Sequence, residues 1–205
     1  MTDFLFNGPE NAPHTIVLAH GAGAPMDSQF MEQIASGLAE AGLRVARFEF
    51  PYMVKRRGDG KRRPPDRAPV LIETYLKVSA ELGPDNLIVG GEPMGGRIAS
   101  MVADEVGVAG LVCLGYPFHP PGKPASLRTA HLEGLETPAL VCQGTRDPFG
   151  TREAVAGYPL PGTIRFHWLE DGDHDFKPRK ASGHTLAGHI ESVADAVASF
   201  AETLG

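Results

Sequence analysis

The sequence predicts one α/β domain, a mostly parallel sheet with helices on both faces, and three observations predict it. Short apolar or β-branched runs alternate along the chain with segments of helical periodicity. The 205 residues, 42% of them hydrophobic, have the size of a single domain and can fill one core. No Pro-rich turn is long enough to link two domains. We therefore expect a single domain over residues 1–205, with right-handed connections between parallel strands.

The expected elements follow from these patterns. Strands are predicted at residues 15–19, 44–50, 86–90, 109–115, 139–144 and 164–169. Helices are predicted from apolar spacings of three and four at residues 30–41, 98–106 and 186–204, of which the last forms one continuous apolar stripe. Ligands of such sheets bind at the carboxyl ends of the strands, so functional residues are expected there.

Composition excludes several classes of function. A net charge of −6 and a pI near 5.7 argue against nucleic-acid binding, which needs a positive surface. No segment approaches the ~18 apolar residues of a membrane span, and the N-terminus lacks a leader pattern, so we expect a cytoplasmic protein that does not enter membranes. Cys113 and Cys142 lie in apolar runs and are expected to be buried thiols. The basic, Gly- and Pro-interrupted residues 55–67 are expected to be a loop, either a docking patch for an anion or a solvated surface.

The most informative segment is an apolar strand that runs through two glycines, Gly90 and Gly91, into Glu92-Pro93-Met94-Gly95 and then a helix. This is the context of a nucleophile elbow, G-x-S-x-G, in which the glycines allow the strand and helix to approach closely. Gly91 and Gly95 occupy the glycine positions, and Pro93 occupies the position of the nucleophile. G-x-x-x-G spacing alone also suits an ordinary strand-to-helix turn, but the flanking elements and the downstream motifs favour the elbow.

An Asp and a His follow the elbow in the order of hydrolase triads. Asp147 comes after the strand at 139–144, and His174 comes after the strand at 164–169. In that chemistry the His removes a proton from the nucleophile, and the Asp orients the His and stabilises its charged form. Each residue alone could belong to an ordinary turn. Together, and in this order, they predict a catalytic-type Asp–His pair.

The remaining part of the expected site is His20-Gly21-Ala22-Gly23, directly after the first predicted strand. Small residues there can expose backbone N–H groups to an oxyanion, so Gly21, Ala22 and Met94 are predicted to form the oxyanion hole. A flexible loop is the alternative. His20 and Glu92 are predicted to border the substrate. The His and Cys residues lack metal-ligand spacing, and no metal or other cofactor is expected.

The chain resembles the short α/β-hydrolase-like proteins related to dienelactone hydrolase, in particular the group with the testis-expressed hydrolase-like proteins and a subunit of the NSL acetyltransferase complex. The resemblance covers nearly the whole chain. It is carried by LAHGAGAPMDS, by FEFPYM with the RRPPD that follows, and by GGEPMGGRIAS, QGTRDPFG and DGDHDF, in this order. It implies an α/β-hydrolase fold and a small-molecule ester, thioester or lactone as substrate or ligand. The family's elbow resembles GGKSMGGR, with Ser where this chain has Pro93 and Lys where it has Glu92.

This departure defines three hypotheses. Proline has no hydroxyl and cannot adopt the positive φ of an elbow nucleophile, although it suits the first turn of a helix. The chain is therefore expected to be a weak or inactive acyl hydrolase that acts through its surviving pocket. The alternatives are an active hydrolase in which Asp147 and His174 activate water, and one with an unrecognised nucleophile. The sequence does not indicate an oligomeric state.

Overall fold

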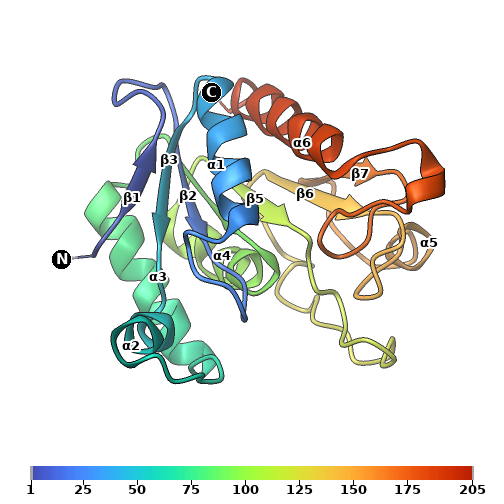
Figure 1. Cartoon of the computed structure of the whole chain (residues 1–205), viewed down its shortest axis with the longest axis horizontal. Helices are drawn as coiled ribbons and strands as arrows, with labels where there is room; N and C mark the ends of the chain where they lie inside the picture. Colours follow the sequence, from blue (N-terminus) through green and yellow to red (C-terminus); the bar gives the residue numbers. More distant parts are fainter. Residues whose placement is uncertain (1, 205) are drawn as a thin grey trace.

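The computed structural model describes residues 2–204, which form a seven-stranded sheet with helices on both faces (Figure 1). The strand order is β1-β3-β2-β4-β5-β6-β7, with β1 antiparallel to β3 and all other neighbours parallel. The strands are β1 (Leu5–Asn7), β2 (Thr15–Ala19), β3 (Arg44–Phe48), β4 (Leu87–Gly91), β5 (Gly110–Leu114), β6 (Ala139–Gly144) and β7 (Ile164–Leu169). The helices are α1 (Gln29–Glu40), α2 (Pro51–Asp59), α3 (Ala68–Leu82), α4 (Pro93–Val106), α5 (Arg152–Val155) and α6 (Leu186–Ala201), with a short 3-10 turn at Lys180–Ser182.

The six expected strands are confirmed. The bounds of β2, β6 and β7 are those expected, and the other three differ by one or two residues at their ends. The expected helices correspond to α1, α4 and α6, and Leu204 lies beyond the end of α6. The α/β fold class with a mostly parallel sheet is therefore confirmed.

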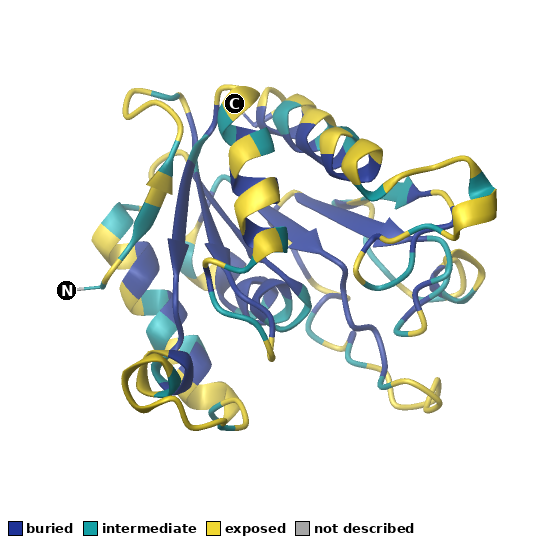
Figure 2. Cartoon of the chain, in the orientation of Figure 1, coloured by how far each residue is buried: buried dark blue, intermediate teal, exposed yellow. Residues whose placement is uncertain are grey.

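The sheet separates two hydrophobic clusters. One cluster lies between the sheet and α3 and α4, and the other lies beneath α1 and α6 (Figure 1). Strands β4, β5 and β6 are buried along their whole length, so their apolar runs serve both clusters (Figure 2). Parallel strands covered on both faces have continuous apolar sequences because the side chains on both faces are buried. Cys113 and Cys142 are buried free thiols, as expected.

The expectation of a loop over residues 55–67 is wrong in its first part. Helix α2 (Pro51–Asp59) extends through these basic residues and ends at Gly60, which is in the left-handed conformation typical of helix C-termini. Pro51 suits its first turn, and Tyr52 and Met53 anchor it in the core. Its last turn also contains Arg56 and Arg57, which interact favourably with the helix dipole. Only residues 60–67 form the expected irregular segment.

Three of the seven basic side chains in residues 55–67 form hydrogen bonds or ion pairs within the chain, namely those of Arg56, Arg57 and Arg63. The Arg57 guanidinium binds Asp27 at 2.8 Å and Glu49 at 2.6 Å, and Arg63 binds Asp59 at 2.5 Å. These pairs leave less free positive charge than the sequence alone indicates. Among residues 2–204, no helix is both long and apolar enough to cross a lipid bilayer.

Candidate functional site

The segment predicted to be a nucleophile elbow joins β4 to α4. Strand β4 ends at Gly91, Glu92 is the N-cap residue, and α4 begins at Pro93. The helix therefore starts where the fixed φ of proline and its missing N–H are tolerated best. The non-glycine residues with positive φ among residues 2–204 lie elsewhere in the chain, so Pro93 lacks the strained conformation of an elbow nucleophile.

Asp147 and His174 form the expected pair. The Asp147 Oδ2 atom lies 2.8 Å from Nδ1 of His174, and Asp147 is completely buried. The other carboxylate oxygen accepts a 2.8 Å hydrogen bond from the Phe149 N–H, and the Phe149 ring stacks on the His174 ring at 4.1 Å between centroids. Because Nδ1 donates to a carboxylate, the neutral imidazole presents an unprotonated Nε2 that can accept a proton.

Gln143, at the carboxyl end of β6, is a part of the site that the sequence patterns did not reveal. Its side-chain nitrogen donates to Asp147 Oδ2 at 2.9 Å, and its side-chain oxygen accepts from the Tyr116 N–H at 2.6 Å. It is completely buried. The available signal was a polar residue that ends an otherwise apolar strand, because a buried amide requires partners. Gln143 holds Asp147 in the orientation that allows it to accept from His174.

Pro93 lies beside the Asp–His pair at the carboxyl edge of the sheet. A Cβ atom placed on Gly115 would lie 3.5 Å from Pro93 Cγ and 3.8 Å from His174 Nδ1, so both side chains border the same point. Pro93 and His174 also line the same two cavities. The structure thus places Pro93, Asp147 and His174 at one edge of the sheet.

Glu92 occupies the position expected for an oxyanion. Its Oε2 atom accepts a 2.7 Å hydrogen bond from the Gly21 N–H, although this amide was expected to face an open cavity. A carboxylate that is only 8% exposed needs such a donor, and the Glu92 backbone is already held by its own N–H to the Ala19 carbonyl at 3.0 Å. Burial raises the pKa of Glu92 to about 7, while the bond from Gly21 acts to lower it.

Of the other residues expected at the oxyanion hole or beside the substrate, Ala22 and Met94 line a cavity and His20 does not. His20 is completely buried, and both its ring nitrogens are engaged: Nδ1 lies 2.6 Å from the Gly21 carbonyl, and Nε2 accepts from the Phe50 N–H at 3.2 Å. His20 therefore shapes the loop and is not among the residues that line the cavities. Ala22 and Met94 line the larger cavity, and the Met94 N–H belongs to the first turn of α4, where amides have no partner within the helix.

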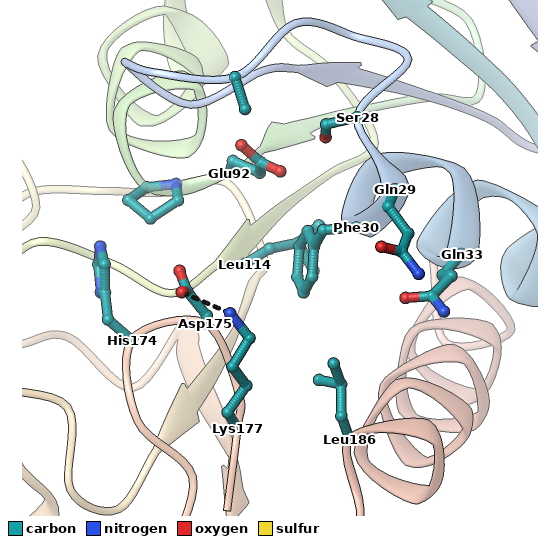
Figure 3. Close-up of a pocket in the computed structure, with 12 residues that line it drawn as sticks. Ser28, Gln29, Phe30, Gln33, Glu92, Leu114, His174, Asp175, Lys177 and Leu186 are labelled. Atoms are coloured by element: carbon teal, nitrogen blue, oxygen red, sulfur yellow. Dashed lines mark hydrogen bonds and ion pairs between the residues drawn. The ribbon is translucent and has the colours of Figure 1, made fainter.

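Two cavities meet at the elbow, and Ala24, Glu92, Pro93, His174 and Asp175 line both of them. The smaller cavity, of about 340 Å³, lies toward α1 and the start of α6. Figure 3 shows its walls, with the Phe30 ring and Leu114 at its floor and the 3.0 Å ion pair between Asp175 and Lys177 at its edge. The larger cavity, of about 780 Å³, lies toward the other side of Pro93 and is lined by residues of α3 and α4 and of the loops after β5 and β6. Both have the size of small-molecule sites. No group of three or more His, Cys, Asp or Glu residues within 2–204 could hold a metal ion.

A buried Asp bonded to a His, beside a strand-to-helix elbow at the carboxyl edge of a parallel sheet, defines the α/β-hydrolase class of site. The model of the family described as "Alpha/beta hydrolase domain" matches residues 12–202. The chain belongs to this family.

Solved structures with the same fold include several hydrolases. A dienelactone hydrolase from Anabaena variabilis is 20% identical, with a TM-score of 0.71 and coverage of 96% of this chain and 89% of that one. An α/β serine hydrolase without a lid from Xanthomonas campestris is 19% identical, with a TM-score of 0.70 and coverage of 97% and 88%. A monoacylglycerol lipase from Paleococcus ferrophilus is 14% identical, with a TM-score of 0.70 and coverage of 98% and 99%. At these identities the likeness is one of fold.

Proposed function

We propose that this protein binds a small acyl compound, an ester, thioester or lactone, in the cavities beside His174, and that it has little or no activity as an acyl hydrolase. The observation that carries the proposal is Pro93 at the position of the elbow nucleophile, next to an Asp147–His174 pair with no hydroxyl to activate. Within the larger family, we place the chain in the short dienelactone-hydrolase-like group with the testis-expressed proteins and the NSL complex subunit, on the strength of its motifs.

The lining of the cavities supports the absence of a nucleophile. Among the residues that line either cavity, Ser28 is the one with a hydroxyl or thiol side chain. Its Oγ caps α1 by accepting from the Met31 N–H at 3.3 Å. A covalent route through a hydroxyl or thiol of this lining would therefore have to use Ser28, and the Glu92 carboxylate beside Pro93 is already bound to Gly21.

The Gly21–Glu92 contact supports the proposal independently. Acyl transfer requires donors that are free to bind the developing oxyanion. Here a carboxylate occupies the N–H of Gly21, one of the three expected donors, and places negative charge where more negative charge would form. Both features oppose acylation, while neither fills the cavities.

A second candidate function is hydrolysis by an activated water molecule. The intact Asp147–His174 pair favours it, because Nε2 of His174 can accept a proton from water without any covalent step. This route would give steady-state ester hydrolysis with no acyl-enzyme burst, which separates it from the binding function.

We also propose that the protein is cytoplasmic and binds neither nucleic acids nor membranes. The net charge of −6 supports the exclusion of nucleic acid. Arg57 and Arg63 each pair with an acidic residue, which further reduces the positive charge available at the surface. A no-binding result with duplex DNA and RNA at low salt would agree with this view.

The proposed function is tested by introducing the hydroxyl group that position 93 lacks. The protein should be inert to a fluorophosphonate probe and should show no burst with an activated ester, because serine-type hydrolases need all triad members for full rate. The substitution Pro93→Ser should introduce probe labelling on the new hydroxyl, detected by intact mass. Adding His174→Ala should abolish it.

Two results would contradict this proposal in different ways. Labelling of the unsubstituted protein would reveal a working nucleophile. Sustained ester hydrolysis without labelling, lost in His174→Ala, would instead establish the water-activating route. Circular dichroism and thermal unfolding of each variant provide the control that the fold is retained.

A further inference from the structure

The larger cavity contains two arginine side chains that the proposed function does not use. Arg97, from α4, and Arg128, from the loop after β5, both line it. The Nε atom of Arg97 is buried and has no hydrogen-bond partner among residues 2–204. Arg128 forms backbone hydrogen bonds, to the Phe118 carbonyl at 2.7 Å and from the Tyr116 hydroxyl at 3.0 Å. Its guanidinium, like that of Arg97, has no carboxylate partner among residues 2–204.

The two guanidinium groups act on the same neighbouring hydroxyl. Burial raises the pKa of Tyr116, and the positive charges of Arg97 and Arg128 act in the opposite direction. Burial also lowers the pKa of His131, and the charge of Arg97 adds to this effect. His131 is held by Ser100 at 2.9 Å and by Tyr116 at 3.2 Å. Both guanidinium groups therefore lie near enough to Tyr116 for their positive charges to act on it.

The acidic residues of the same cavity already have partners. Asp66 accepts from the Tyr52 N–H at 2.9 Å, Glu92 accepts from Gly21, and Asp175 pairs with Lys177 at 3.0 Å. Buried or half-buried guanidinium groups normally bind carboxylates or phosphates, because their donors are costly to leave unpaired. Among the charged side chains within residues 2–204 that line this cavity, those of Arg97 and Arg128 are thus the ones without a hydrogen-bond or ion-pair partner.

Several apolar side chains line the same cavity as these arginines. Leu71, Ile98, Met94, Pro117 and Phe149 contribute to the lining. A volume of about 780 Å³ accommodates an organic ligand with an apolar body, rather than an inorganic ion alone. The two arginines are therefore suited to an anionic group, and the apolar side chains of the same cavity are suited to a hydrocarbon or aromatic group.

We infer that Arg97 and Arg128 form an anion-binding subsite that selects acyl compounds carrying a carboxylate or phosphate group on an apolar body. The inference rests on the proposed function and specifies the ligand class of the same pocket. The anionic group would lie on the two guanidinium groups, and the apolar part would extend toward Pro93 and His174, which border the same cavity.

The test compares charged probes with a neutral analogue by isothermal titration calorimetry. The probes are 4-phenylbutyrate and phenyl phosphate, and 4-phenylbutyramide replaces the carboxylate with an uncharged group of similar shape. At least one anion should bind about tenfold or more tightly than the amide, the difference expected for charge-assisted hydrogen bonds. Added salt should weaken the binding of the anion and leave the binding of the amide unchanged. The anion that binds more tightly shows whether the subsite prefers a carboxylate or a phosphate group.

Substitutions of the arginines test whether they form the anion-binding subsite. Arg97→Gln and Arg128→Gln should each remove most of the preference for the anion, whereas Arg62→Gln, an equal loss of charge on the exposed segment outside the cavity, should retain it. Arg128→Gln tests the subsite if Arg97→Gln proves unstable, because Arg128 lies on a loop. Equal binding of anions and amide would overturn the subsite while leaving the binding pocket intact. Absence of binding by all three compounds would overturn both, and labelling by fluorophosphonate would overturn the proposed function alone.

Discussion

At the scale of single residues, Glu92 is subject to two opposing effects. Burial disfavours its charged form, and the Gly21 N–H favours it at a distance of 2.7 Å. Burial is the larger effect, so the pKa of Glu92 rises from 4.5 to about 7. The charge beside His174 is consequently sensitive to pH near neutrality.

This shift predicts how stability depends on pH. Between about pH 4.5 and 7 the folded chain retains a proton on Glu92 that the unfolded chain has released, so raising the pH through this window removes stability. Glu92→Gln keeps an oxygen that can accept from Gly21 and cannot titrate. From pH 5 to pH 8, the free energy of unfolding of this variant should gain about 2 kcal/mol relative to that of the unsubstituted protein, as measured by urea denaturation. Glu40→Gln, at an exposed position, is the matched control and should show no such gain.

The identities of the site residues could be predicted from the sequence, but their contacts could be predicted only in part. Asp147 and His174 follow strands whose ends must meet at one edge, so their proximity follows from the order of elements. The Gly21–Glu92 bond joins residues 71 positions apart and depends on a side-chain conformation. No periodicity encodes it. The same is true of Gln143, whose role depends on which backbone amide faces it.

At the scale of elements, α4 lies so close to the sheet that its positions 95 and 96 have no room for a side chain. A Cβ atom on Gly95 would overlap the Ala19 carbonyl oxygen at the end of β2, and one on Gly96 would lie 2.8 Å from the Gly91 carbonyl oxygen. The glycine spacing of the elbow is thus explained by packing, whatever residue occupies position 93. This explains why the elbow geometry could be predicted from its glycines even though position 93 is a proline.

Glycine-to-alanine substitutions in two helices should therefore have opposite effects. Gly95→Ala forces α4 away from β2 and is expected to destabilise the fold by about 1 to 3 kcal/mol, as other overpacked interiors do. Gly58→Ala in α2 meets no atom within 4 Å and should stabilise by about 0.5 to 1 kcal/mol, through helix propensity. Chemical denaturation of both variants measures the difference, and equal effects would show that α4 does not require close approach to β2.

Elements with strong periodicity could be predicted, and those defined by context could not. The stripe of α6 and the apolar runs of β4 to β6 are encoded locally. Strand β1 has three residues, too few to show alternation, and exists because it pairs with the edge of β3. Helix α2 is rich in basic residues, which suggested a loop, and it is held in place by two buried side chains, Tyr52 and Met53.

At the scale of the whole molecule, the site is assembled from loops at the ends of four parallel strands. The Gly21 amide follows β2, Glu92 and Pro93 follow β4, Asp147 follows β6, and His174 follows β7. Because β2, β4 and β6 are tightly packed and largely buried, replacing one residue should leave the other groups in position. The nucleophile position and the oxyanion position can therefore be changed separately.

If the two positions act independently, Pro93→Ser alone should give only partial acylation, because Glu92 still occupies the Gly21 N–H. Pro93→Ser with Glu92→Ala should free this donor and remove the negative charge beside the developing oxyanion. One oxyanion-hole donor is worth about 10²- to 10³-fold in rate, so the double variant should react with a fluorophosphonate at least about tenfold faster than Pro93→Ser alone. Glu92→Ala by itself should remain unlabelled, because it supplies no hydroxyl, and His174→Ala added to the double variant should abolish labelling. The measurement is the rate of labelling by intact mass at pH 8, where the Glu92 carboxylate is charged. Equal rates for the single and double variants would show that Glu92 does not limit the oxyanion site.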